Sequence, residues 1–231
     1  MKTGGMRARP NLLERPTLHA RPSLLLYDWD NTLVDGWAGI TFALNSALTA
    51  FNLPHWSVQD TRERARVSMR ESFPILFGEG WHGARDIFLA SLAAQHLEHV
   101  RPMAGAGELL LAGRAWTQGV VSNKTGRFLR AEVAHLGWAA FFATVVGAGD
   151  AAADKPDPAP ILLALEQLGA GASRDIWYLG DTASDMEAAR AAGVTGVLVG
   201  DASHDGGIAR AAPDLHFVSA HALAAHLRAL A

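Results

Sequence analysis

Short apolar runs alternate with helix-like segments along most of this chain. A continuous apolar run of a few residues is typical of a strand that is buried on both faces of a parallel sheet. Such runs occupy residues 23–27, 119–122, 144–146, 176–179 and 195–199. The helix-like segments occupy residues 107–116, 126–136, 158–168 and 185–192, and glycines suited to a helix C-terminus follow three of them at Gly137, Gly169 and Gly193. Because strands and helices alternate, the pattern predicts an α/β fold with a doubly wound parallel sheet.

The alternation stops between residues 37 and 100, where helical patterns follow one another without a strand. These patterns cover residues 38–51, 58–69 and 84–100. We therefore expect an inserted all-helical cap at residues 37–100 and a catalytic core formed by residues 23–36 and 101–231. Because the chain leaves the core just after the first strand, the cap is placed to fold over that edge and exclude water.

Composition narrows the kinds of partner and chemistry. The chain has 231 residues, a formal net charge of −3 and no cysteine. The lack of cysteine excludes disulfides, thiolate nucleophiles and cysteine-ligated metals, and the small net charge gives no nucleic-acid footprint. No apolar stretch is long enough to span a bilayer, and residues 1–22 are expected to form a tail without an apolar signal core. We expect a cytoplasmic protein that acts on a small molecule, without a nucleic-acid or membrane partner; the oligomeric state is left open.

Two carboxylates follow the first predicted strand. Asp28 and Asp30 are two residues apart, so in an extended segment their side chains share a side and can converge on one point. One carboxylate can then attack phosphorus while the other transfers a proton. An isolated Asp-x-Asp pair is equally typical of a turn or helix cap, and Thr32 of a local hydroxyl cap.

A second carboxylate pair, Asp181 and Asp185, follows the strand that ends near Gly180. Four residues apart, they lie within one turn if a helix begins there, and Mg²⁺ prefers such carboxylates together with waters and phosphate oxygens. Taken alone, the pair is more typical of helix capping by Asp181 or Ser184, with Asp185 complementing the helix dipole. Four carboxylates at one sheet edge repel one another without a cation, so the joint pattern favours a Mg²⁺ site.

A hydroxyl and a lysine complete the candidate site. Ser122 ends an apolar run, and the backbone N–H groups of Asn123 and Lys124 follow it at an expected helix start, where phosphate oxygens are commonly bound. Lys155 precedes Pro156-Asp157-Pro158, a restricted path that can fix its ammonium group. A capping serine and a surface lysine are the commoner explanations of each residue alone. Their place between the carboxylate motifs favours phosphate binding.

These motifs together resemble the haloacid dehalogenase superfamily, and within it the phosphatases that carry a helical cap after the first motif, a group that contains phosphoglycolate phosphatases. The matching segments are Asp28 to Asp35, Ser122-Asn123-Lys124, Lys155-Pro156 and Gly180 to Asp185. The resemblance extends over nearly all of the chain beyond residue 22. Two positions depart from the usual pattern: Asn31 stands where glycine is commonest, and Gly36 where a serine often follows.

The resemblance implies a Rossmann-like core, a Mg²⁺ cofactor and a role for each matching residue. Asp28 would be the nucleophile that forms an aspartyl-phosphate, and Asp30 would protonate the leaving alcohol and then activate water. Magnesium would be held by Asp28, the backbone carbonyl of Asp30, Asp181 and Asp185, the last directly or through water. Ser122, Asn123 and Lys155 would bind the phosphoryl group. The implied activity is hydrolysis of a small-molecule phosphate monoester. A phosphotransferase, a phosphonate hydrolase and a non-enzymatic phospho-acceptor or binding protein are the alternatives.

Cap residues are expected to select the leaving group. Arg70 is a candidate to meet an acidic substrate such as phosphoglycolate, although neighbouring arginines compete with it and commonly form a solvated helix face. His96 and His99 lie three residues apart on a predicted cap helix. Without a third metal ligand we expect them to be exposed.

Overall fold

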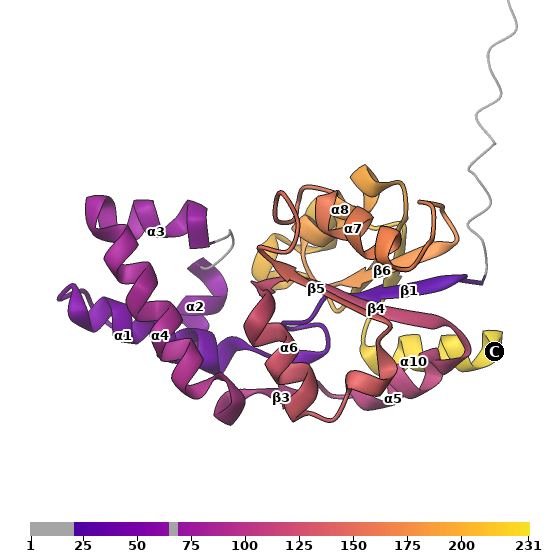
Figure 1. Ribbon diagram of the computed structural model, residues 1–231, viewed down its shortest axis with the longest axis horizontal. Helices are drawn as coiled ribbons and strands as arrows, with labels where there is room; N and C mark the ends of the chain where they lie inside the picture. The colour runs from indigo at the N-terminus through magenta and orange to yellow at the C-terminus, as the bar shows by residue number, and fades with distance from the viewer. Residues whose placement is uncertain (1–20, 65–68) are drawn as a thin grey trace, which may run out of the picture.

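The core of the protein is a six-stranded, all-parallel sheet with helices on both faces. The computed structural model describes residues 21–64 and 69–231, without the side chains of Arg70 and Glu71. The strand order is β5-β4-β1-β6-β7-β8. The strands span β1 Leu24–Tyr27, β4 Thr117–Thr125, β5 Thr144–Ala148, β6 Ile176–Gly180, β7 Thr195–Val199 and β8 Leu215–Phe217. The doubly wound parallel sheet expected from the sequence is confirmed (Figure 1).

Alternate residues of the central strand face two apolar layers. Leu25 and Tyr27 of β1 pack with helices on one face, whereas Leu24 and Leu26 pack with helices on the other, as the two-residue side-chain period of a strand requires. The first layer contains α5 (Ala106–Ala112), α6 (Gly126–His135) and α10 (Ala220–Leu230), and the second α7 (Ala159–Gln167) and α8 (Ala183–Ala192). Helices α5 and α10 lie together below the sheet in Figure 1, and α7 and α8 lie above it.

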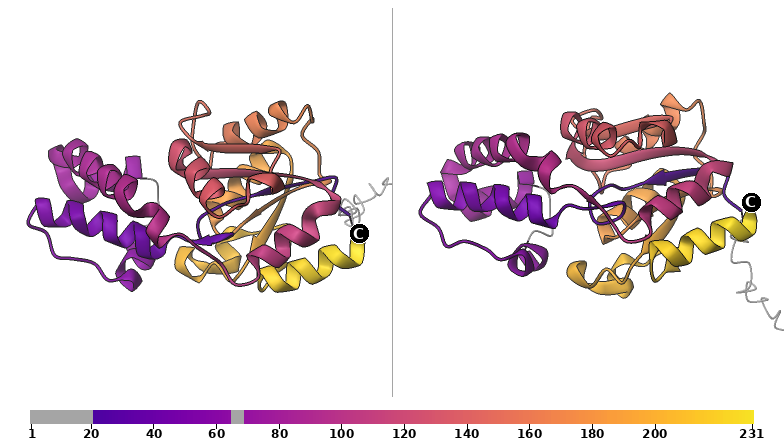
Figure 2. Two further views of the ribbon diagram at one scale, coloured as in Figure 1. Left: turned by 60° about the horizontal axis from the view of Figure 1, so that its bottom comes forward. Right: turned by 90° about the horizontal axis from the view of Figure 1, so that it is seen from below.

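Four helices lie between β1 and α5, and all but the second contribute side chains to an apolar cluster separate from those of the core. They span α1 Trp37–Ala50, α2 Val58–Arg64, α3 Met69–Phe77 and α4 Trp81–His99. Leu44, Leu48, Phe73 and Phe77 form the centre of this cluster, with further apolar side chains around them. All views in Figures 1 and 2 show these helices beside the sheet rather than on one of its faces. Helix α3 was not expected, because Pro74 lies inside it and a proline usually interrupts a helical pattern.

Two short strands join the helical insertion to the core. β2 (Val34–Asp35) leaves the core and β3 (Arg101–Pro102) returns to it, and the two pair in antiparallel fashion. The backbone N–H of Met103 also donates to the carbonyl of Leu33 at 2.9 Å. The exit of the chain, a few residues after Asp28 and Asp30, and its return at β3 are therefore fixed side by side. Within the described residues, no helix combines the length and the apolar character needed to cross a membrane.

Candidate active site

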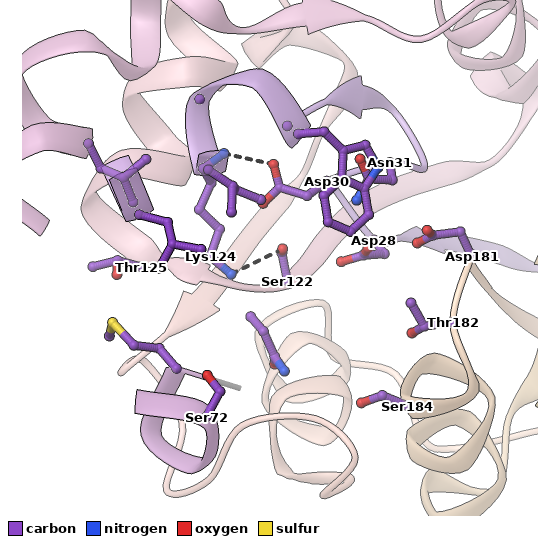
Figure 3. A pocket seen from close by; sticks show the side chains of 18 of the residues that line it. Asp28, Asp30, Asn31, Ser72, Ser122, Lys124, Thr125, Asp181, Thr182 and Ser184 are labelled. Carbon is purple, nitrogen blue, oxygen red and sulfur yellow. Dashed lines mark hydrogen bonds and ion pairs between the residues drawn. The ribbon is translucent and has the colours of Figure 1, made fainter. Parts of the chain in front are cut away.

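The candidate residues meet where neighbouring parallel strands end. Strand β1 lies between β4 and β6, so Asp28 after β1, Ser122 in β4 and Asp181 after β6 come from three adjacent strands. The carboxyl ends of parallel strands share one edge of the sheet. The three residues line one cavity of about 510 Å³, together with Asp30, Lys155 and residues of the helical insertion. Figure 3 shows this cavity from close by.

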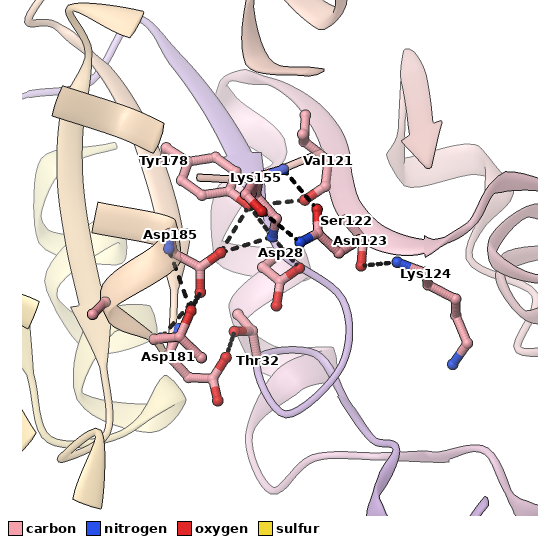
Figure 4. A network of polar contacts seen from close by, with 12 residues as sticks. Asp28, Thr32, Val121, Ser122, Asn123, Lys124, Lys155, Tyr178, Asp181 and Asp185 are labelled. Atoms are coloured by element: carbon pink, nitrogen blue, oxygen red, sulfur yellow. Dashed lines mark hydrogen bonds and ion pairs between the residues drawn. The ribbon is translucent and has the colours of Figure 1, made fainter. Parts of the chain in front are cut away.

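Lys155 lies at the centre of the site and is almost fully buried. Its Nζ is 2.7 Å from Asp28 Oδ1, 2.7 Å from Asp185 Oδ1 and 2.7 Å from the hydroxyl oxygen of Tyr178 (Figure 4). The side chain of Asn123 holds the Lys155 backbone from both sides, donating to its carbonyl and accepting from its N–H, each at 2.9 Å. The Asn123 side chain thus positions the lysine. The helix start expected at Asn123 and Lys124 is wrong, because β4 continues to Thr125 and α6 begins at Gly126.

The pKa values of the three buried carboxylates follow from burial and from their distance to Lys155. Burial raises the pKa of Asp28 to about 8, with Lys155 acting against that rise and the carboxylates of Asp185 and Asp181 adding to it. Burial likewise raises the pKa of Asp181. For Asp185 burial acts in the same direction, but Lys155 and the hydrogen bonds from Thr182 outweigh it and leave its pKa below the ordinary value. The site therefore disfavours ionisation of Asp28 and Asp181 unless another cation is present.

Asp185 combines two functions that the sequence left as alternatives. Its Oδ2 accepts hydrogen bonds from the backbone N–H groups of Asp181 and Thr182 and from the Thr182 hydroxyl. Thr182 is the N-cap of α8 and forms a reciprocal capping box with Asp185. A capped helix start is present, but its N-cap is Thr182 rather than Asp181 or Ser184, and Asp185 takes part in the capping box itself. The Oδ1 atom of Asp185 still faces Lys155, so this one residue anchors both the helix and the lysine.

Three carboxylates are close enough to share a divalent cation. One oxygen each from Asp28, Asp181 and Asp185 lies within 4.8 Å of the others, and all three residues are buried. Asp181 accepts a hydrogen bond from Thr32 at 3.2 Å, and His204 Nε2 lies 3.2 Å from its other oxygen. A hard cation that prefers oxygen ligands fits this set, because its charge would favour the ionised forms of Asp28 and Asp181, which burial and the neighbouring carboxylates disfavour.

Asp30 is held away from the other carboxylates by Lys124. The Lys124 Nζ lies 2.8 Å from Asp30 Oδ1 and 2.8 Å from Glu132 Oε2, and Figure 3 shows the lysine reaching toward Asp30. Burial acts to lower the pKa of Lys124, but the two carboxylates raise it above its ordinary value, so the ammonium group stays charged. The Asp30 carboxylate is therefore fixed by an ion pair at the cavity wall.

Backbone geometry explains the two departures from the family pattern. Asn31 has a φ of 63°, a left-handed conformation that glycine adopts freely and asparagine more readily than other residues. At Gly36 a Cβ atom would collide with Oδ1 of Asp30. Glycine at position 36 thus leaves room for the Asp30 carboxylate in the position where Lys124 holds it.

Glu132 links this site to the helical insertion, a connection that the sequence did not reveal. Besides Lys124, it accepts a hydrogen bond from Trp29 Nε1 at 2.7 Å and contacts His96 Nδ1 at 2.9 Å. His96 lies on α4 and is buried against Phe128, so the expectation that it is exposed is wrong. Tyr178 and His204 were also missed, because neither belongs to a recognisable motif. Arg70 lies within α3, but its side chain is outside the described part of the structure, so its predicted role stays a prediction.

Comparison with known proteins identifies the class to which this fold and site belong. The model of the haloacid dehalogenase-like hydrolase family matches residues 25–199, and the chain belongs to this family. It is a hydrolase of the phosphatase type and is similar to phosphoglycolate phosphatases. That of Xylella fastidiosa is 30% identical over 203 residues, which cover 84% of this chain and 87% of the relative. That of Nitrosococcus oceani is 30% identical over 185 residues, which cover 74% of this chain and 81% of the relative.

Solved structures share the architecture. A haloacid dehalogenase superfamily hydrolase from Ehrlichia chaffeensis is 26% identical, with a TM-score of 0.64 and coverage of 91% of this chain and 98% of the other. A protein from Haemophilus somnus described as a predicted phosphoglycolate phosphatase has a TM-score of 0.76 at 22% identity, covering 87% of this chain and 95% of the other. The second likeness concerns the fold alone.

Proposed function

We propose that the protein is a Mg²⁺-dependent phosphatase that hydrolyses a small-molecule phosphate monoester through an aspartyl-phosphate. The observation that carries this proposal is the convergence of Asp28, Asp181 and Asp185 around buried Lys155 at the ends of adjacent strands. Concentrated negative charge with one internal cation suits a site that receives a phosphate together with a divalent metal ion. Helices α1–α4, residues 37–100, would form the cap domain.

In this mechanism a carboxylate oxygen of Asp28 attacks phosphorus, and the bond from phosphorus to the substrate alcohol breaks. Asp30 gives the leaving alcohol its proton and later takes a proton from the water that attacks the phosphoenzyme, so that inorganic phosphate leaves and Asp28 is restored. Ser122 and Lys155 bind the oxygens of the transferring group and offset their charge. The hydrogen bond from Lys124 to Asp30 supports this division of roles, because it would hold the Asp30 carboxyl group at the cavity wall.

The metal ion would be bound by Asp28 and Asp181, with the backbone carbonyl of Asp30 as a further ligand. Asp185 fits the indirect role, through water, because both its oxygens already accept hydrogen bonds from the protein. When bound, Mg²⁺ neutralises phosphate charge and orients the phosphoryl group for attack. The names of the relatives suggest 2-phosphoglycolate as a first candidate substrate. The cytoplasmic location expected from the sequence stays a prediction.

Removal of divalent metal should abolish phosphate release, and Mg²⁺ should restore it. The test is a panel of 2-phosphoglycolate, sugar phosphates and nucleoside monophosphates, assayed with excess EDTA and after addition of Mg²⁺. Binding should also raise the unfolding temperature, because a cation that binds the folded state and not the unfolded chain stabilises it by RT ln(1 + c/Kd), where c is the free Mg²⁺ concentration. An Asp181→Asn variant should lose most of the Mg²⁺-induced thermal shift. Undiminished turnover in EDTA would contradict the metal assignment.

Replacement of Lys124 by Met should impair proton donation more than phosphoryl binding. Without its ion pair Asp30 is no longer fixed, so we expect kcat/KM for an alkyl phosphate to fall by about 10- to 100-fold. The loss for p-nitrophenyl phosphate should be much smaller, because its leaving group needs no proton. Arg130→Met on α6, which removes a half-exposed cation paired with Asp150, is the control. Equal losses with both substrates would mean that Lys124 is only structural.

A further inference from the structure

The cavity continues from the carboxylates into the helical insertion. Its volume of about 510 Å³ lies in the range of pockets that hold drug-sized ligands. One wall is formed by the strand ends with Asp28 and Ser122, and the opposite wall by α1, α3 and α4. Figure 3 shows Ser72 of α3 across the pocket from Asp28. The cavity therefore extends into the helical insertion and is larger than a two-carbon leaving group requires.

The wall formed by the cap helices is largely apolar. Three helices contribute apolar side chains, most of them three or four residues apart, which places them on one side of each helix. They are Ile40 and Leu44 on α1, Met69, Phe73 and Leu76 on α3, and Phe88, Leu89 and Leu92 on α4. Ile40, Leu89 and Leu92 are only half-buried and lie outside the apolar cluster at the centre of the insertion. This surface is available to an apolar ligand.

The charges around the cavity disfavour a second anionic group on the substrate. Its described lining contains eight carboxylates and four lysine or arginine side chains. Each of these cations already pairs with a carboxylate of the protein: Arg64 with Asp60, Lys124 with Asp30, Lys155 with Asp28 and Arg210 with Asp205. A buried carboxylate without a partner is costly. An acidic leaving group would therefore find no free cation among the described lining residues.

From the apolar wall and the charge balance, we propose that the substrate is a phosphate monoester of an apolar alcohol, alkyl or aryl, whose hydrocarbon lies against α1, α3 and α4. This inference rests on the phosphatase function proposed above and specifies its substrate class. The phosphate lies at Asp28, and the alcohol leaves with a proton while inorganic phosphate is released. Each methylene buried against the wall increases kcat/KM by about fourfold.

A matched pair of substrates tests the proposal directly. Isobutyl phosphate has the shape of 2-phosphoglycolate, with two methyl groups in place of the carboxylate oxygens. With the full-length protein and Mg²⁺, we expect kcat/KM for isobutyl phosphate to exceed that for 2-phosphoglycolate by at least about tenfold, as expected when a carboxylate lacks a buried partner. Along the series from butyl to octyl phosphate, kcat/KM should rise by about fourfold per methylene until the cavity is filled.

A truncation in the apolar wall and a matched control show where the alcohol is bound. Leu92→Ala shortens a side chain of the apolar wall and should reduce kcat/KM for octyl phosphate by about tenfold, with a much smaller effect on butyl phosphate. Ile75→Ala is the control, because Ile75 lies on α3, is 86% exposed and does not line the cavity. Circular dichroism should show both variants folded; if Leu92→Ala is not, Leu89→Ala on the same helix replaces it.

Three results would overturn the proposal. A preference for 2-phosphoglycolate with no dependence on chain length would show that the apolar wall only packs the insertion. Loss of that preference in Arg70→Ala would then support an acidic leaving group. A chain-length dependence that is the same in the leucine truncation as in the wild type would place the alcohol elsewhere. No phosphate release from any compound, with Mg²⁺ present, would refute the phosphatase function itself and this inference with it.

Discussion

Asp28→Asn should reduce phosphate release by more than about a thousandfold while the protein remains folded. An amide cannot form the bond to phosphorus that the covalent mechanism requires, and removal of a nucleophile commonly costs far more than removal of a binding group. The loss should appear with every substrate that the wild-type protein hydrolyses. Steady-state phosphate release, together with a test for incorporation of substrate phosphate into protein, measures both the turnover and the intermediate.

Stability separates a chemical cause of this loss from misfolding. Burial raises the pKa of Asp28 from 3.8 to about 8, so its contribution to stability is full below its unfolded-state pKa and is lost as the pH rises through the folded-state value. Without metal, the neutral Asp28→Asn variant should therefore be at least as stable as the wild type near about pH 9. Asp86→Asn, on the surface of α4, is the control for the substitution itself. Activity above a trace in Asp28→Asn would exclude the aspartyl-phosphate.

The sequence predicted the strand ends well because the rule that governs them is local. Asp28, Ser122 and Asp181 each follow or end an apolar run, and adjacent parallel strands bring such positions together without any knowledge of side-chain packing. The strands β1, β6 and β7 accordingly lie within one residue of the expected ranges at either end. Asp28 and Asp181 could be placed at one edge of the sheet because each directly follows a predicted strand.

The links between distant segments could not be predicted in this way. Glu132 meets His96 although the two are 36 residues apart, and one belongs to the core and the other to the helical insertion. Neither has a local pattern that distinguishes it from a surface residue on an amphipathic helix. Asp185 was difficult for another reason, since capping and site formation use the same side chain at the same position. Only the packed structure shows that the two interpretations are compatible.

Lys155→Met should have the second large effect, because it removes the cation that two buried carboxylates share. Methionine has nearly the same length but no charge, so Asp28 and Asp185 would be left without their partner. Breaking a buried ion pair on one side commonly costs about 3–5 kcal/mol of unfolding free energy. We also expect kcat to fall by at least about a hundredfold, because the phosphoryl group loses a charged donor.

A double variant shows whether unpaired charge is the cause. In Lys155→Met/Asp28→Asn, one of the two stranded carboxylates is replaced by a neutral amide, so urea denaturation should show recovery of much of the lost stability while activity stays absent. The single variant should also lose stability more steeply than the wild type as the pH rises above about 5, because carboxylates with raised pKa values keep their protons in the folded state while the unfolded chain releases them. If the double variant is no more stable than Lys155→Met, the unpaired charge of Asp28 is not the cause of the loss.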